Sequence, residues 1–143
     1  MVVDDLVKRL GLVAHPEGGW YREAYRDAAC STIHYLLPAR GLAPLHRVRE
    51  RVELWHFYGG TPCEVHTIVD GAHRVVTLGP DAPLAIVPPG AWQATRASDG
   101  PAWCGCTVAP AFDFAAWEMP SRAEMLRALP SVLHAVVEEL TRP

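Results

Sequence analysis

The stretch LHRVRERVELWHFYGG, residues 45–60, contains a run of large side chains that ends in a pair of glycines. Successive side chains of a β-strand point to opposite faces, so Glu53 and Trp55 would share one face of a strand here. His56 and Tyr58 would then lie on the other face. The stretch therefore predicts a strand with an acidic and aromatic side and a second side of different chemistry.

The sequence around this stretch has the same texture from about residue 15 to residue 110. Short runs rich in Trp, Tyr, Val, Ile and Thr alternate with Gly, Pro and Asp, which is the pattern of strands and turns. The predicted strands span residues 20–25, 31–37, 53–58, 63–69, 74–78, 84–87, 92–96 and 102–108. Eight short strands without intervening helices favour a closed or sandwiched all-β architecture over a parallel βαβ sheet.

Both ends of the chain have helical patterns. Asp4 and Asp5 precede an apolar run that Gly11 closes, which predicts a short capped helix over about residues 4–10. We expect this helix to cover an open end of the β-structure.

The C-terminal part, about residues 121–141, has the pattern of two helices. Ser121 and Glu124 form a capping box at the start of the first, and Pro130 opens the second. The second helix has an apolar stripe made of Leu133, Val136, Val137 and Leu140. We expect these helices to pack on the outside of the barrel or on a second subunit.

Length and composition are those of one globular domain over residues 1–143, with the barrel at about residues 15–118. The net charge is −3 and there is no long basic run, which excludes nucleic acid as an expected partner. No apolar run approaches the roughly 20 residues that span a bilayer. Acidic residues stand near the start, where a signal peptide would be positive, so we expect a cytoplasmic protein without membrane contact.

The four cysteines are expected to be reduced thiols, because no export signal accompanies them. Cys104 and Cys106 are separated by one residue, which is not the spacing of a zinc knuckle or a thioredoxin-like site. In a strand the two thiols would simply share one face.

Residues 45–60 and the later segment VPPGAWQ, residues 87–93, resemble the two sequence motifs of the cupins. In that superfamily two His, a Glu and a further His converge on a metal inside the barrel. His46 matches the first His and Glu53 the Glu, whereas Val48 stands in place of the second His and Gln93 in place of the last. Gly60 matches the glycine that closes the first motif.

Five further phrases strengthen the resemblance. They are HPEGG at 15–19, STIHYLLP at 31–38, WHFY at 55–58, GCTVAP at 105–110 and FDF at 112–114. Together they resemble a family of small bacterial and fungal cupins, mostly of unknown function and similar in structure to sugar-nucleotide epimerases. The resemblance implies a double-stranded β-helix, or jelly-roll barrel, with a short N-terminal helix and two C-terminal helices.

The same resemblance places His46 and Glu53 in the barrel as a candidate catalytic pair. Two such groups buried near each other would alter each other's proton affinity, as acid–base catalysis at neutral pH requires. Trp55 would form an aromatic wall beside Glu53. Gln93 is a poor ligand for transition metals but hydrogen-bonds a carbonyl or hydroxyl well, which favours substrate binding.

Three other residues are candidates for substrate binding. His66 and Tyr58 lie in predicted strands. Tyr58 is on the face opposite Glu53, whereas the sequence leaves open whether His66 faces into the barrel or outward. Arg22 in a barrel lining would hold a carboxylate or phosphate, provided that its face of the strand is the inner one. The alternative for each is an outer-surface position.

Three functional hypotheses follow. The first is an isomerase, epimerase or dehydratase without a cofactor, acting on a polar sugar- or nucleotide-derived substrate through His46 and Glu53. The second is a non-catalytic protein that binds a small metabolite in the same pocket. The third is a metal-dependent oxygenase or isomerase, with Fe, Mn, Ni or Zn held by His46, Glu53 and Gln93, and with His66 or water completing the set.

The predicted architecture also has sheet edges. Unpaired edges invite a partner strand, so we expect a homodimer.

Overall fold

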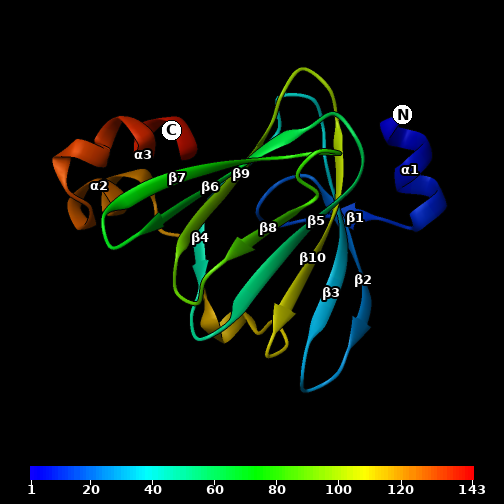
Figure 1. Cartoon of the computed structure of the whole chain (residues 1–143), viewed down its shortest axis with the longest axis horizontal. Coiled ribbons are helices and arrows are strands. Elements are labelled where there is room, and N and C mark those ends of the chain that lie inside the picture. The colour runs from blue at the N-terminus through cyan, green and yellow to red at the C-terminus, as the bar shows by residue number, and fades with distance from the viewer.

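The computed structural model describes residues 1–143 and consists of two antiparallel sheets packed face to face (Figure 1). The six-stranded sheet has the order β1 (Val13–Ala14), β2 (Trp20–Arg26), β3 (Ser31–Leu37), β10 (Ala102–Ala109), β5 (Val52–Gly60) and β8 (Leu84–Val87). The five-stranded sheet has the order β11 (Trp117–Glu118), β4 (Leu42–Val48), β9 (Trp92–Ala97), β6 (Cys63–Val69) and β7 (Ala72–Leu78). This is the jelly-roll arrangement that the sequence predicts.

All eight predicted strands are present, together with three that the pattern did not reveal. β1 and β11 are two residues long, and β4 contains Pro44, a residue that usually counts against a strand. Glu50, with a φ of 60°, forms the turn between β4 and β5. Arg47, three residues earlier, still belongs to β4.

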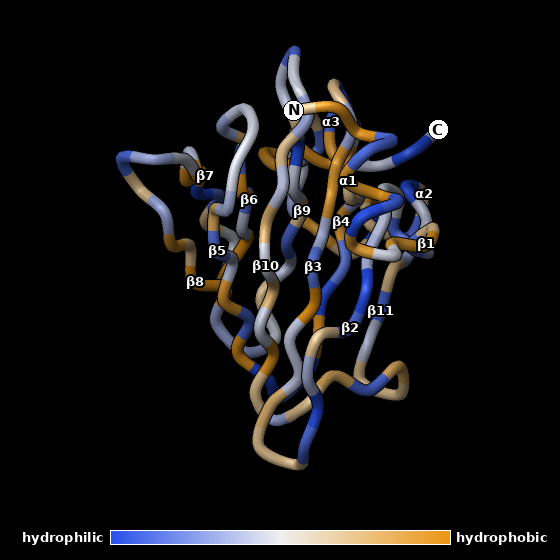
Figure 2. The backbone as a smooth tube through the Cα atoms, turned by 90° about the vertical axis from the view of Figure 1, so that its right-hand side faces the viewer, coloured by the Kyte–Doolittle hydropathy of each residue, from blue (hydrophilic) through white to orange (hydrophobic).

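The core lies between the sheets and follows the alternation of the strands. Tyr35, Leu37, Trp55, Cys104 and Cys106 belong to one buried cluster on the inner face of the six-stranded sheet. β2 is largely hydrophilic, blue in Figure 2, because this strand is exposed along most of its length. All four cysteines are free thiols, as the sequence predicts.

Helix α1 (Val3–Leu10) packs beside the six-stranded sheet (Figure 1). Its buried Leu6 contacts the cluster that contains Leu36 and the partly buried Trp20 and Trp103. Leu36 alternates with the inward Tyr35 and Leu37, so it belongs to the outer face of its sheet. The helix therefore covers an outer sheet face and not an open end of the barrel, contrary to the expectation from the sequence.

Helices α2 (Arg122–Ala128) and α3 (His134–Leu140) lie together beside the five-stranded sheet (Figure 1). The predicted capping box is present, since Ser121 and Glu124 bond reciprocally. A short 3-10 turn, η2 (Ser131–Leu133), leads into α3. The apolar stripe of α3 packs on Leu45, Ile68 and Ala94 of the sheet, which confirms that the helices cover the outside of the barrel. None of the helices has the length and apolar character needed to cross a membrane.

Candidate functional site

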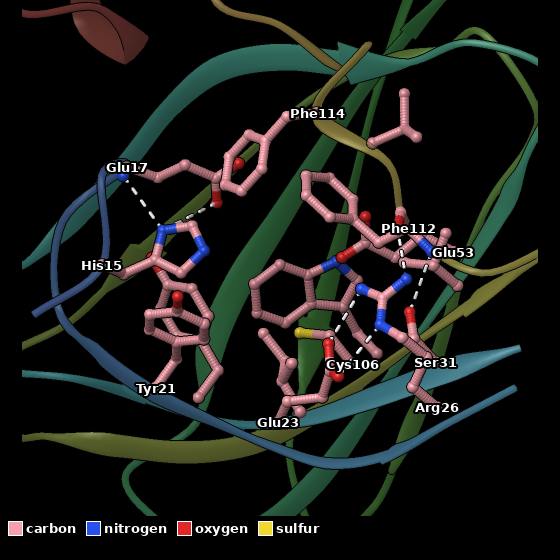
Figure 3. A pocket seen from close by; sticks show the side chains of 15 residues that line it. His15, Glu17, Tyr21, Glu23, Arg26, Ser31, Glu53, Cys106, Phe112 and Phe114 are labelled. Carbon is pink, nitrogen blue, oxygen red and sulfur yellow. Dashed lines mark hydrogen bonds and ion pairs between the residues drawn. The ribbon is translucent and has the colours of Figure 1, made fainter. Parts of the chain in front are cut away.

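A cavity of about 100 Å³ opens into the inner face of the six-stranded sheet. Its walls come from β2, β3, β5 and β10, from the loop that precedes β2, and from residues 112–114, which lead into the 3-10 turn η1 (Phe114–Ala116). Figure 3 shows His15 and Glu17 on one side of the cavity, and Glu53, Cys106 and Arg26 on the other. Both buried carboxyl groups of the barrel thus reach the same enclosed space.

Glu17 is held in place by the loop that carries it and by two donors. Gly18 and Gly19 follow it with φ angles of 111° and 73°, a backbone shape that other residues adopt only under strain. Its Oε2 lies 2.9 Å from His46 Nε2 and accepts a 2.8 Å hydrogen bond from Trp117 Nε1. The carboxyl group is therefore fixed from the five-stranded sheet.

His46 forms a buried ion pair with Glu17. Its Nδ1 donates to the carbonyl oxygen of Pro44 at 2.7 Å, and its Nε2 faces Glu17, so both ring nitrogens carry protons. Burial alone would lower the pKa of His46, but the charge and hydrogen bond of Glu17 outweigh it and raise that pKa to about 9. Burial would likewise raise the pKa of Glu17, and His46 holds it below its usual value instead.

Glu53 belongs to a hydrogen-bonded chain that crosses between the sheets. Trp55 Nε1 donates to Gln93 Oε1 at 3.1 Å, and Gln93 Nε2 donates to Glu53 Oε1 at 3.0 Å. Burial raises the pKa of Glu53 to about 7; the charge of His46 opposes this rise, and the carboxylate of Glu17 adds to it. Glu53 is thus a carboxyl group that exchanges its proton near neutral pH.

His15 is fixed as a neutral imidazole. The backbone N–H of Glu17 donates to its Nδ1 at 3.0 Å, so the ring proton of the neutral form is on Nε2. Burial lowers the pKa of His15 against the attraction of Glu17, which keeps the ring uncharged at pH 7. In Figure 3 the other ring nitrogen points toward the middle of the cavity.

The open side of the cavity is formed by β2. Tyr21 and Glu23 share the inward face, and the register shifts between Glu23 and Tyr25, so that Arg26 pairs with Ser31 and also turns inward. Arg26 donates from Nε and Nη2 to the two carboxylate oxygens of Glu23 at 2.9 and 2.8 Å. Its Nη1 donates to the carbonyl oxygen of Phe112 at 2.8 Å.

The structure brings four of the sequence-predicted site residues together. Glu53 and Trp55 line the cavity, whereas His46 and Gln93 lie behind its wall, where they hold Glu17 and Glu53. His46 and Glu53 influence each other's charge, as predicted, but the direct partner of His46 is Glu17.

The other three candidates lie away from the cavity. Tyr58 is 48% exposed on the outer face of β5, where its ring packs against Trp103. His66 faces outward from β6 and shares a 2.9 Å hydrogen bond with His73. Arg22 bonds the carbonyl oxygen of Leu10 in α1, because the inward face of β2 is that of Tyr21. None of these three side chains lines the cavity, so their predicted part in substrate binding finds no support in its geometry.

The predicted metal ligands do not fit a metal ion. Both nitrogens of His46 are engaged by Pro44 and Glu17, and the amide of Gln93 is engaged by Trp55 and Glu53. No group of three or more His, Cys, Asp or Glu side chains in the structure is arranged to hold a metal ion. His66, on the outer face, is not available to complete the set.

Several site residues were missed at the level of sequence. Glu17 and His15 belong to the phrase HPEGG, which was used only as a mark of resemblance, and its concentration of His, Glu and Gly was the available signal. Arg26 was not predicted as a site residue because the bulge in β2 changes which residues face inward. Phe112 and Phe114 come from a segment without regular periodicity.

The fold and its buried polar interior define a cupin barrel. Residues 4–120 match the family described as Cupin superfamily (DUF985), and the chain belongs to that family. A hypothetical protein from Leishmania major is similar over the full length of both chains, with 25% identity and a TM-score of 0.92. A protein from Shewanella oneidensis is 31% identical over 98% of this chain and 97% of its own, with a TM-score of 0.84.

More distant likeness extends to the capsular polysaccharide assembling protein CapF of Staphylococcus aureus. That match has 10% identity, covers 76% of this chain and 33% of the other, and has a TM-score of 0.65, so it concerns the fold alone. No curated protein matches the chain.

Proposed function

We propose that the cavity binds a small polar, ring-shaped substrate and that Glu53 moves a proton on it. The observation that carries this proposal is a buried carboxyl group that lines an enclosed cavity and has a pKa of about 7. A group whose pKa lies near the working pH both accepts and returns a proton efficiently. Isomerases, epimerases and dehydratases share this step.

His15 supplies the second function that such a reaction needs. When a base removes a proton next to a carbonyl group, negative charge develops on the oxygen, and a fixed N–H donor stabilises it. His15 presents a neutral Nε2–H for this purpose, with the tautomer set by the backbone N–H of Glu17. Glu53 and His15 lie on opposite sides of the cavity, so a bound ring would lie between them.

In this proposal His46 is a positioning residue. Its ring is held by an ion pair with Glu17 and by the carbonyl of Pro44, and it does not line the cavity. It keeps Glu17 ionised, and Glu17 in turn raises the pKa of Glu53. The proton exchange with substrate is therefore assigned to Glu53 alone.

The size of the cavity limits the substrate. About 100 Å³ is small beside the roughly 300–1,000 Å³ of sites for drug-sized ligands. Aromatic rings of Tyr21, Trp55 and Phe112 form much of the wall, which suits the flat face of a single ring. A monosaccharide-sized ring with a carbonyl or hydroxyl group agrees with this space.

The test is deuterium exchange. Cyclic ketones and keto sugars of this size are incubated in D₂O with the protein, and solvent-derived deuterium at carbon is followed by NMR. We expect exchange to rise with pH and level off above about pH 7, as Glu53 ionises. Glu53→Gln should slow exchange by at least ~100-fold. The exposed Glu50→Gln should leave it unchanged.

A compound that binds in the cavity yet gains no deuterium would contradict proton transfer and favour the second candidate function, metabolite binding without reaction. Exchange that persists in Glu53→Gln would also contradict the proposal.

Dimerisation is proposed separately. β8 is an edge strand of the six-stranded sheet and is coloured as hydrophobic in Figure 2. Its Leu84 and Ile86 are 47% and 60% exposed. An apolar edge is a site for pairing with another copy. We expect analytical ultracentrifugation to give the mass of a dimer for the parent protein and that of a monomer for Ile86→Lys. A monomeric parent protein would contradict the proposal.

A further inference from the structure

The charged side chains around the cavity are unequally distributed. Three carboxyl groups line it, those of Glu17, Glu23 and Glu53, and Arg26 is the one Lys or Arg side chain among the lining residues. His15, the other basic group, is neutral at pH 7 because burial lowers its pKa. Behind the wall, the imidazolium of His46 lies 2.9 Å from Glu17 and offsets one of these negative charges, as Arg26 offsets another, so the net charge around a ligand becomes negative through Glu53 when that group is ionised.

The charge of Arg26 is already paired within the protein, although two of the five N–H donors of its guanidinium make no bond to the protein. Two of its donor nitrogens bond the carboxylate of Glu23, and the third bonds the carbonyl oxygen of Phe112. A phosphate or carboxylate that used those two donors would lie beside the carboxylate of Glu23, which already neutralises this guanidinium. An anion inside the cavity would face the ionised Glu53, while the two nearby cations, Arg26 and His46, are each already paired with a carboxylate.

Glu17 retains an acceptor on the cavity side. Its Oε2 receives the bonds from His46 and Trp117, but its Oε1 has only a 3.8 Å approach to His15 Nδ1, an atom that already accepts a hydrogen bond. Glu53 uses Oε1 for Gln93, and the thiol of Cys106 also hydrogen-bonds the carboxyl group of Glu53. Two carboxyl groups in one enclosed space, each with acceptor capacity left, suit a donor that carries positive charge.

The walls between the carboxyl groups are aromatic. Trp55 and Tyr21 lie on the sheet side, and Phe112 and Phe114 form an edge-to-face pair with ring centres 4.9 Å apart. The faces of aromatic rings attract cations, and recognition of ammonium groups by several rings is a common use of this attraction.

We infer that this cavity takes a small organic cation, namely a single ring that carries an ammonium group together with a hydroxyl or carbonyl, as in an amino sugar. The ammonium group lies between Glu17 and Glu53 against the aromatic wall, and the oxygen function receives the Nε2–H of His15. This inference rests on the proposed function in that it names the substrate class of the same site. The inference separates the cavity from sites for sugar nucleotides, because their phosphates would find no unpaired cation here.

The experiment compares three probes of one shape: cyclohexylamine, cyclohexanol and cyclohexanecarboxylate. Each is titrated into the protein at pH 8, where the amine is protonated and Glu53 is ionised. Binding is followed through the indole N–H resonance of Trp55, which lines the cavity. We expect the amine to bind at least ~10-fold more tightly than the alcohol, and the carboxylate to bind least.

Glu53→Gln should lower the affinity for cyclohexylamine about tenfold and leave that for cyclohexanol unchanged, since only the charged partner is removed. Glu50→Gln, on the exposed turn between β4 and β5, is the matched control and should change neither affinity. A carboxylate that binds as tightly as the amine, an amine that fails to bind at millimolar concentration, or an unchanged amine affinity in Glu53→Gln would overturn the inference.

The probes carry no carbonyl group and undergo no exchange, so their binding is independent of catalysis. Amine selectivity without deuterium exchange on any ligand would leave this inference standing and remove the proposed function. Rapid deuterium exchange on an anionic substrate would support the proposed function and overturn the inference that the ligand is a cation.

Discussion

His46 and Glu17 form an ion pair inside the barrel, with 2.9 Å between Nε2 and Oε2 and with side chains that are 2% and 8% exposed. The first motif of the family thus gives its leading histidine a carboxylate partner from a distant loop. Because Pro44 takes the other ring nitrogen, His46 is committed to holding Glu17. This relationship determines what titrates in the cavity and how stability depends on pH.

Replacing His46 should destabilise the fold strongly. His46→Ala leaves a buried carboxylate without its partner, which costs about 3–5 kcal/mol in comparable buried pairs. His46→Ala with Glu17→Gln removes both charges and should recover much of the loss. Urea denaturation at pH 7 measures all the variants. If the single and double variants are equally unstable, the ion pair is not the cause of the loss.

The ion pair should also make stability fall on the alkaline side. The folded pKa of His46, about 9, is above its ordinary value of 6.5, so its contribution is complete below pH 6.5 and is lost as the pH rises through 9. This difference between the folded and the ordinary pKa corresponds to on the order of 3 kcal/mol in the free energy of unfolding. Denaturant midpoints between pH 6 and pH 10 measure the effect, and a flat profile would rule it out.

Glu53 should lower stability above neutral pH for a different reason. Its folded pKa of about 7 exceeds the ordinary 4.5, so the folded protein loses stability as the pH rises from 4.5 to 7 and the buried group ionises. Glu53→Gln removes this cost, on the order of 3 kcal/mol. The variant should therefore be more stable than the parent at pH 8 and nearly equal at pH 4.5. Equal stability at pH 8 would show that Glu53 ionises freely.

Trp55 should control the titration of Glu53 through Gln93. Trp55→Phe keeps the ring but leaves Gln93 Oε1 without its donor, at a cost of about 1–3 kcal/mol for a buried acceptor. Gln93 is then free to turn its amide away from Glu53, so the pKa of Glu53 should rise above 7. Carbon-13 NMR of the Glu53 carboxyl measures it. Trp103→Phe, whose indole makes a 3.3 Å bond to His34 away from the cavity, is the control and should leave that pKa unchanged.

Glycine should be required at position 60 because of the backbone conformation there. Its φ is 85°, and a Cβ at this position would meet the carbonyl oxygen of Pro101. Gly60→Ala is expected to destabilise the protein by more than ~2 kcal/mol. Gly71 has a φ of 76° but nothing within 4 Å of an added Cβ, so Gly71→Ala isolates the conformational strain, about 1 kcal/mol. Similar losses in both variants, measured by thermal unfolding, would show that the contact with Pro101 is unimportant.

The fold could be predicted from the sequence because the patterns that indicate strands and helices lie within short segments of the chain. Alternation within one strand put Glu53 and Trp55 on one face and Tyr58 on the other, and the cupin resemblance put Glu53 inside the barrel, as the structure has it. Alternation fails within β2, where the bulge after Glu23 turns Arg26 inward. A bulge depends on the neighbouring strand, and a single sequence does not show it.

The site was predicted in part for a similar reason. The motif positions located His46, Glu53 and Gln93 in the interior, but their partners are set by packing between distant segments. Glu17 reaches His46 only because two glycines bend its loop into the barrel. The resemblance also suggested a shared metal, whereas the geometry of His46 directs its nitrogens to Glu17 and Pro44.

The hydrogen-bonded chain from Trp55 through Gln93 to Glu53 begins and ends on β5 and passes through β9 of the opposite sheet. The side-chain amide of Gln93 therefore links the two sheets of the barrel. The strength of its hydrogen bond to Glu53 depends on whether Glu53 carries a proton. A ligand that takes up or releases that proton also changes how firmly the two sheets are joined. The protonation state of Glu53 and the cohesion of the two sheets are therefore linked through one side chain, that of Gln93.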